Sequence, residues 1–206
     1  MDVATTLGPA RLHLDEPDAD RAGVLALGHG AGGGIAAPDL VAVAAAARDA
    51  GWLVARVEQP WRVAGGRVAP APARLDVGWT AALEALATLA ASPRGPLVVG
   101  GRSAGARSAC RTATAVGADG VLCLAFPLHP PGRPERSRLA ELAGAAAHLP
   151  VLAVQGRRDA FGRAEELFEV VPPGVTLVAV DGDHGLAAGA AQAAAAVAGW
   201  LTSRFG

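Results

Sequence analysis

Short apolar segments alternate with alanine-rich segments along most of the chain. Several apolar segments are β-branched and lack polar alternation, which favours strands buried on both faces of a parallel sheet. We expect strands over residues 11–15, 23–27, 53–57, 96–100, 121–126, 151–155 and 175–180. We expect helices over residues 38–50, 77–91, 104–116, 138–147, 163–170 and 186–203.

This alternation predicts an α/β fold with a mostly parallel central sheet, right-handed crossovers and helices on both faces. Pro38 and Asp76 are expected to start helices, and Gly51 to end one. The chain has 206 residues and shows neither an internal repeat nor a domain-splitting linker. We therefore expect one domain over residues 1–206.

Two segments interrupt the alternation, at residues 61–74 and 127–136, and both are rich in glycine, proline and arginine. Each follows the end of an expected strand, the sheet edge where open α/β folds bind ligands. They are candidate pocket walls or a small lid, and the alternative is that they are ordinary surface loops.

Residues 98–105 read Val-Val-Gly-Gly-Arg-Ser-Ala-Gly, between an expected strand and an expected helix. Gly-x-Ser-x-Gly in this context is the pattern of a nucleophile elbow, in which a serine sits on a sharp strand-to-helix turn. Ser103 is therefore the candidate nucleophile. With 27 glycines in the chain, a chance match is expected in about one such chain in twelve, so the motif needs support.

His184 and Asp159 supply that support, because each directly follows one of the last two expected strands. We expect His184 to be the base for Ser103 and Asp159 to orient it. The order Ser, Asp, His is that of α/β-hydrolases. The alternatives are a loop histidine that caps the final helix or faces water, and an aspartate that caps a helix or pairs with a nearby arginine. Asp183 and Asp181 are rival carboxylates, although Asp183 adjoins His184 and is poorly placed to orient it.

An acyl-transfer site also needs donors for the developing oxyanion. The N–H of Ala104 is one candidate, at the start of a helix whose dipole favours negative charge. The second is expected from the glycine-rich segment 28–34. We favour the N–H of Ala31, with Gly30 and Gly32 as alternatives.

The same segment formally matches a dinucleotide fingerprint, Gly28-x-Gly30-x-x-Gly33. That interpretation is disfavoured because no acidic residue except Glu58 ends the next strand at the usual place, and because the elbow with Asp159 and His184 explains more residues. His29 in this segment is expected to stabilise the loop by hydrogen bonds rather than to act as a base or metal ligand.

Five motifs together, at residues 29–33, 101–105, 127–132, 155–159 and 182–184, resemble those of small capless α/β-hydrolases related to dienelactone hydrolases. The resemblance runs from about Gly23 to the C-terminus. It implies an α/β-hydrolase fold with no cap domain, in a family of mostly predicted hydrolases that also includes eukaryotic subunits of larger assemblies. Ala104 and Ala106 replace the Met and Gly common in relatives, and Ala160 replaces a common Pro, which affects pocket shape rather than the catalytic groups.

These observations predict a serine esterase that cleaves an ester or related acyl bond through an acyl-enzyme, with no cofactor and no metal. A thioesterase, a lactone hydrolase and a non-catalytic interaction domain are the alternatives. Without a cap the pocket is expected to be open and suited to short acyl groups. Candidate substrate-binding residues are Trp61, Arg102, Phe126, His129 and Phe161.

The formal net charge of −1 gives no reason to expect nucleic acid or an anionic membrane as a partner. No apolar stretch is long enough to predict a membrane span, and the first residues lack the pattern of a signal peptide. Cys110 and Cys123 have no metal-site spacing and are expected to be reduced core thiols. We therefore expect a cytoplasmic protein whose partner is a small acyl substrate; the sequence leaves the oligomeric state open.

Overall fold

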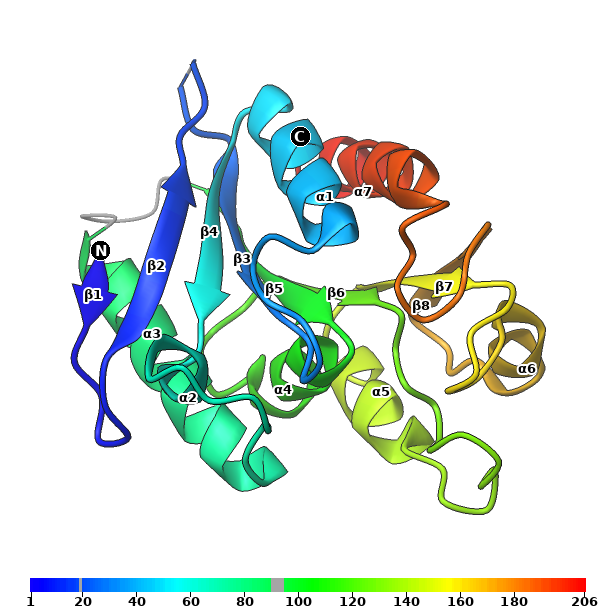
Figure 1. Ribbon diagram of the computed structural model, residues 1–206. Helices are drawn as coiled ribbons and strands as arrows, with labels where there is room; N and C mark the ends of the chain where they lie inside the picture. Colours follow the sequence, from blue (N-terminus) through cyan, green and yellow to red (C-terminus); the bar gives the residue numbers. More distant parts are fainter. Residues whose placement is uncertain (19, 90–94) are drawn as a thin grey trace.

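The computed structural model describes residues 1–18, 20–89 and 95–206, and these form a sheet of eight strands in the order β1-β2-β4-β3-β5-β6-β7-β8 (Figure 1). Strands β3 to β8 run parallel to one another, β2 is antiparallel to β4, and β1 is antiparallel to β2. The strands are β1 (Asp2–Val3), β2 (Ala10–Asp15), β3 (Gly23–Gly28), β4 (Trp52–Glu58), β5 (Leu97–Arg102), β6 (Gly120–Leu124), β7 (Val151–Gly156) and β8 (Val175–Val180).

Helices cover both faces of this sheet. Helices α1 (Pro38–Asp49) and α7 (Ala190–Phe205) pack together on one face, and α3 (Pro72–Leu89), α4 (Ala104–Thr112) and α5 (Leu139–Ala146) lie on the other (Figure 1). The short helices α2 (Pro60–Val63) and α6 (Ala164–Val170) complete the set in the described residues. Every residue of β3, β6 and β7 is buried, as expected for strands covered on both sides. The predicted α/β fold with a mostly parallel sheet is confirmed.

Each face has its own hydrophobic core. Leu40 of α1 and Val197 of α7 belong to one cluster, and Trp79 of α3 and Leu142 of α5 belong to the other. Among the described residues, no helix combines the length and apolar character needed to cross a membrane.

The start expected for the helix over residues 77–91 was wrong. Helix α3 begins at Pro72, ahead of Asp76, because proline has a preset φ and needs no hydrogen bond at the first helical position. Asp76 lies inside the helix and pairs with Arg111 of α4 at 2.7 Å. Residues 90 and 91, at the end of the predicted helix, lie outside the described residues. The segment 61–74, which was expected to be a loop, also contains most of helix α2 and the first residues of α3.

Two other helix boundaries differ by several residues, and one strand was not expected. The last helix begins at Ala190 because Leu186 has a φ of 49°, which a right-handed helix cannot accommodate. Helix α4 ends at Thr112, before a turn at Gly117, whose φ is 67°. Strand β1 was not expected, because two residues are too few to show a period.

Strand β3 has β4 on one side and β5 on the other, although the chain passes from β3 to β4 first. The loops that leave the carboxyl ends of β3 and β5 therefore diverge to opposite faces of the sheet. Such a switch point opens a crevice at the carboxyl edge of the sheet. The glycine-rich loop after β3 and Ser103 after β5 both lie there.

Candidate active site

Ser103 occupies the turn between β5 and α4, with φ 53° and ψ −108°. Positive φ is uncommon for a residue with a Cβ atom, and such strain concentrates at functional sites. The Ser103 N–H donates to the carbonyl oxygen of Leu124 in β6, 2.9 Å away, which anchors the turn to the sheet. The serine is thereby presented at the carboxyl edge of the sheet.

The two flanking glycines allow this turn to press against β3. A Cβ atom added to either Gly101 or Gly105 would collide with the carbonyl oxygen of Gly28. Gly30 is less constrained, because its added Cβ would lie 3.5 Å from Ser103 Cβ, an ordinary van der Waals contact. The glycines of the motif therefore serve the close packing of strand, loop and helix around the serine.

Ser103, His184 and Asp159 form a continuous chain of polar contacts. His184 Nε2 lies 2.8 Å from Ser103 Oγ, and His184 Nδ1 lies 2.8 Å and 3.0 Å from the two carboxylate oxygens of Asp159. Asp159 follows β7 and is 1% exposed, whereas His184 follows β8. An Nδ1–H that donates to the carboxylate leaves Nε2 free to accept the serine proton. The structure thus brings together the three residues that the sequence selected.

The Asp159 carboxylate is held by two further donors. The Phe161 N–H donates to Oδ1 at 2.8 Å, and the Gln155 side-chain amide donates to Oδ2 at 3.1 Å. Gln155 was not selected from the sequence. Its only signal is a buried polar position at the end of the apolar run of β7.

His184 is also held through its ring and its backbone. The Phe161 ring packs on the imidazole, with centroids 4.2 Å apart. Arg102 donates from Nε and Nη2 to the His184 carbonyl oxygen at 3.3 Å and 3.0 Å. The same guanidinium lies 3.4 Å from the buried carboxylate of Asp39 in α1, where burial raises the pKa of Asp39 and Arg102 opposes that rise. Arg102 therefore ties the elbow, α1 and the histidine loop together.

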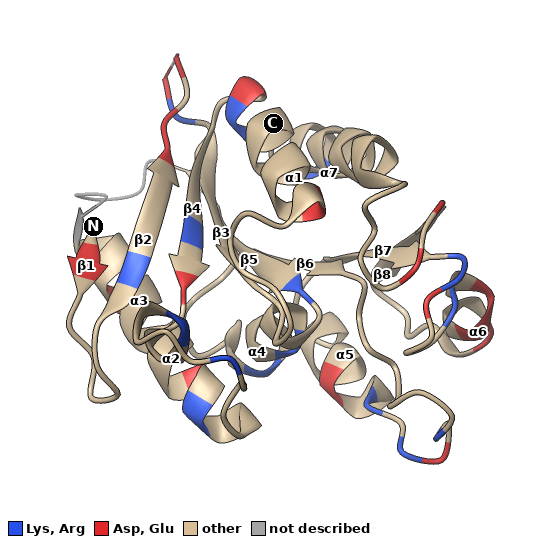
Figure 2. Ribbon diagram, viewed as in Figure 1, with Lys and Arg blue, Asp and Glu red and all other residues tan. Residues whose placement is uncertain are grey.

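A cleft of about 380 Å³ lies over Ser103. Ala31, Ala104, Phe161 and His184 line it together with the serine, and so do the arginines Arg102, Arg107 and Arg138. Glu141 of α5 pairs with Arg107 at 2.6 Å, and basic and acidic segments meet there between α4 and α5 (Figure 2). Arg138 donates to the Pro127 carbonyl oxygen at 3.2 Å, and burial lowers its pKa.

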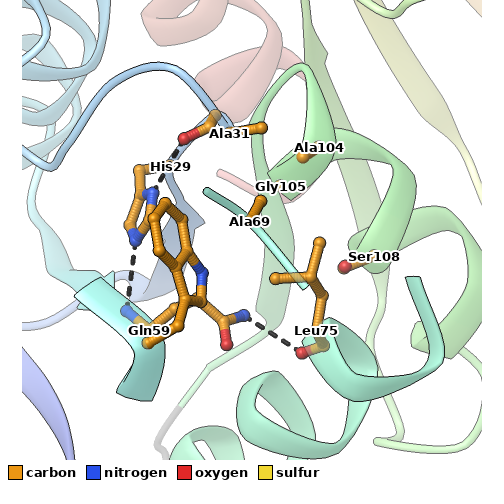
Figure 3. Close-up of a pocket in the computed structure, with 10 residues that line it drawn as sticks. His29, Ala31, Gln59, Ala69, Leu75, Ala104, Gly105 and Ser108 are labelled. Carbon is orange, nitrogen blue, oxygen red and sulfur yellow. Dashed lines mark hydrogen bonds between the residues drawn. The ribbon is translucent and has the colours of Figure 1, made fainter. Parts of the chain in front are cut away.

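The backbone N–H groups of Ala31 and Ala104 lie beside Ser103 and have no partner among the described residues, and the same holds for Gly30 and Gly32, the alternatives to Ala31. Ala104 is the first residue of α4, where backbone N–H groups lack acceptors within the helix. His29 supports the loop that carries Ala31, as the sequence suggested. Its Nδ1 lies 3.0 Å from the Gly30 carbonyl oxygen, and its Nε2 accepts from the Gln59 N–H at 3.1 Å (Figure 3). Burial lowers the pKa of His29, which keeps the ring neutral in this role.

Three of the five candidate substrate-binding residues lie at cavities near Ser103. Arg102 and Phe161 line the cleft, and Trp61 lines a smaller cavity beside Ala31 and Ala104. The structure does not bring Phe126 or His129 to the cleft. Phe126, two residues beyond the end of β6, is fully buried because its side chain packs into the hydrophobic core, and the imidazole of His129 contacts Glu166 and the Pro130 carbonyl oxygen instead. These positions do not fit a substrate-binding role.

The contact between His129 and Glu166 predicts a pH-dependent contribution to stability. The Arg163 guanidinium, with help from His129, lowers the pKa of Glu166 to about 2. A lowered carboxyl pKa stabilises the fold above the unfolded value near 4.5, and this stabilisation is lost as the pH falls towards 2. Glu166→Gln should therefore reduce the free energy of unfolding at pH 6 by about 1 kcal/mol or less, given the partial exposure of the pair. Urea unfolding at pH 6 and at pH 3 measures the effect.

The control for this variant is Glu165→Gln, because Glu165 is more exposed and its one ion pair among the described residues, with Arg157, is longer, at 3.3 Å. The difference between the two variants should be larger at pH 6 than at pH 3, and it should vanish only as the pH approaches 2. The pKa of His129 is raised, chiefly by its hydrogen bond to Pro130, so the loss caused by Glu166→Gln should also shrink once His129 deprotonates at high pH. An equal loss at pH 6 and pH 3 would contradict this account.

Within the described residues, no group of three His, Cys, Asp or Glu side chains is placed to hold a metal ion. Cys110 and Cys123 are free and buried, with their sulfur atoms 3.4 Å apart. Neither sulfur lies in the contacts made by Ser103, His184 and Asp159.

Solved structures resemble this chain over almost its whole length. An α/β serine hydrolase without a lid from Xanthomonas campestris is 18% identical with a TM-score of 0.76. The alignment covers 100% of this chain and 94% of the Xanthomonas chain. An α/β serine hydrolase homologue from Coxiella burnetii is 16% identical with a TM-score of 0.79, and the alignment covers 98% of this chain and 96% of the Coxiella chain. Est1E from Butyrivibrio proteoclasticus is 16% identical with a TM-score of 0.77, and the alignment covers 98% of this chain and 97% of the Est1E chain. At these identities the likeness shows a shared fold.

No curated protein matches the chain in sequence. A family model described as an alpha/beta hydrolase domain, however, matches residues 21–197. That range contains the elbow, the glycine-rich loop after β3, Asp159 and His184. The chain therefore belongs to the alpha/beta hydrolase domain family.

Proposed function

We propose that the protein hydrolyses carboxylic esters through a serine acyl-enzyme. The observation that carries the proposal is the position of His184. Its Nε2 atom lies 2.8 Å from Ser103 Oγ, and its Nδ1 atom lies 2.8 Å from the buried Asp159 carboxylate. A serine hydroxyl is a weak nucleophile until an adjacent base takes its proton, and the base needs a third group to orient it. An open cleft above the serine gives a substrate access to it.

The reaction follows from these contacts. Ser103 Oγ attacks the carbonyl carbon while its proton passes to His184 Nε2, and Asp159 stabilises the resulting imidazolium. His184 then returns this proton to the alcohol oxygen as the bond between carbon and alcohol breaks. A water molecule repeats the sequence on the acyl-enzyme: His184 takes a proton from the water, and Ser103 leaves with that proton when the acid is released.

The backbone N–H groups of Ala31 and Ala104 are proposed to hold the oxyanion. Both line the cleft beside Ser103, and neither has another partner in the described residues. Negative charge at the start of α4 is also favoured by the helix dipole. Donors already in place at the oxygen position lower the barrier without reorganisation during the reaction.

We also propose that the protein works in the cytoplasm. Cys110 and Cys123 are both free and buried, although their sulfur atoms are only 3.4 Å apart. Thiols that remain unpaired at close range suit a reducing compartment.

An active-site probe tests the proposal directly. A fluorophosphonate should label the native protein at Ser103, located by mass mapping of peptides, and the protein should turn over 4-nitrophenyl acetate. Thioester and lactone substrates in the same assay separate the related acyl-transfer activities. A folded protein that neither reacts with the probe nor hydrolyses any of these substrates would be a non-catalytic domain, and the proposal would fail.

A further inference from the structure

A second, much smaller cavity adjoins the cleft at the proposed oxyanion donors. It lies between the loop after β3, the start of α4 and helix α2, and its volume is about 10 Å³ (Figure 3). Gly30, Ala31 and Ala104 line both this cavity and the cleft, whereas Ser103 and His184 line only the cleft. The two spaces therefore meet at the place proposed for the carbonyl oxygen.

We propose that this small cavity is the acyl pocket and that Trp61 restricts it to an acetyl group, an inference that rests on the esterase function proposed above. When the carbonyl oxygen points at Ala31 and Ala104, the acyl group and the alcohol leave the carbonyl carbon in different directions. His184 Nε2 has to reach the alcohol oxygen to protonate it, so the alcohol takes the side of the cleft that His184 lines. The acyl group is then directed away from His184, towards the small cavity.

The size of the cavity sets the acyl length. A volume of about 10 Å³ is room for about one water-sized group, which suits the methyl of an acetyl group and no longer chain. The walls are firm: Leu75 and Ser108 are buried, and the Trp61 ring packs at 5.6 Å from that of His29. His29 is in turn held by hydrogen bonds to Gly30 and Gln59. A longer chain would have to displace packed side chains.

Trp61 also separates this cavity from a larger one. A space of about 150 Å³ lies beyond it, lined by Leu7, Pro60 and Arg74, among others. Trp61 and Gln59 line both spaces. Removing the indole should therefore join the two cavities and make room for several methylene groups.

The test is the acyl-chain preference, measured as kcat/KM for 4-nitrophenyl acetate, butyrate and hexanoate. Forcing extra methylenes into a packed space typically costs about 1–3 kcal/mol, so the wild-type protein should favour acetate over hexanoate by about five- to 150-fold. Trp61→Ala should raise the hexanoate-to-acetate ratio at least tenfold. Trp200→Ala is the matched control, because Trp200 is another half-buried tryptophan and lines a separate surface hollow near the opposite end of the strands. It should leave the ratio unchanged.

Two further variants keep the test decisive if Trp61→Ala does not fold. Trp61→Phe should shift the ratio in the same direction by a smaller factor. Ala69→Val adds two methyl groups to the wall of the small cavity and should lower kcat/KM for acetate more than for formate. Failure of the wild-type protein to hydrolyse any ester overturns the proposed function. Equal use of acetate and hexanoate, or an unchanged ratio in the Trp61 variants, overturns the acyl pocket and leaves the esterase function standing.

Discussion

Replacing Ser103 with alanine should lower kcat for 4-nitrophenyl acetate by about five to six orders of magnitude. The variant keeps the Cβ atom and the unusual φ of 53°, so the elbow and its contacts remain. What it loses is the oxygen that lies 2.8 Å from His184 Nε2. Without that oxygen no acyl-enzyme forms, and the remaining rate reflects only binding and the oxyanion donors.

Ser203→Ala is the matched control, because Ser203 lies in α7, on the opposite face of the sheet from α4. It should retain full activity. Fluorophosphonate labelling should disappear in Ser103→Ala and persist in Ser203→Ala, while circular dichroism shows both variants folded. Labelling that survives the loss of Ser103 would mean that another serine is the nucleophile.

Much of the fold could be predicted because the signals are local. The apolar runs of β3, β6 and β7 are buried over their whole length, so a lack of polar alternation was a reliable guide to central strands. Gly101 and Gly105 predicted the elbow for a reason visible in the structure, since a side chain at either position would collide with β3. Ser103, Asp159 and His184 could be selected because each follows its own strand, and parallel strands end at one edge.

The supporting contacts could not be predicted, because they join segments far apart in the chain. Asp39 stands at the start of α1 like many helix-starting acids, and only the fold places Arg102 beside it at 3.4 Å. Gln155 could not be selected from the sequence, because its contact with Asp159 depends on how the chain turns back towards β7 after that strand ends. The same limit explains Phe126 and His129: position after a strand does not say whether a side chain turns to the core, to Glu166 or to the cleft.

The second large effect is expected from Asp159→Asn, which should lower kcat by about four orders of magnitude. The Asp159 carboxylate accepts hydrogen bonds from Phe161 N–H, the Gln155 amide and His184 Nδ1. An asparagine replaces one acceptor oxygen with a donor of nearly the same shape. That donor cannot face another N–H, so His184 is driven to the tautomer that carries its proton on Nε2. This nitrogen can then no longer accept the Ser103 proton.

Asp183→Asn is the matched control, because Asp183 is the carboxylate next to His184 in the chain and the rival candidate for orienting it. Its side chain accepts from the Gly185 N–H at 2.8 Å and so serves the loop rather than the imidazole. We expect its kcat to stay within a few-fold of the wild-type value. KM should change little in Asp159→Asn, because the carboxylate lies beneath His184 and does not line the cleft. A large loss of kcat in Asp183→Asn, together with a nearly unchanged kcat in Asp159→Asn, would identify Asp183 as the orienting carboxylate. The buried contact at 2.8 Å between Asp159 and His184 Nδ1 would then not be the one that sets the tautomer of His184.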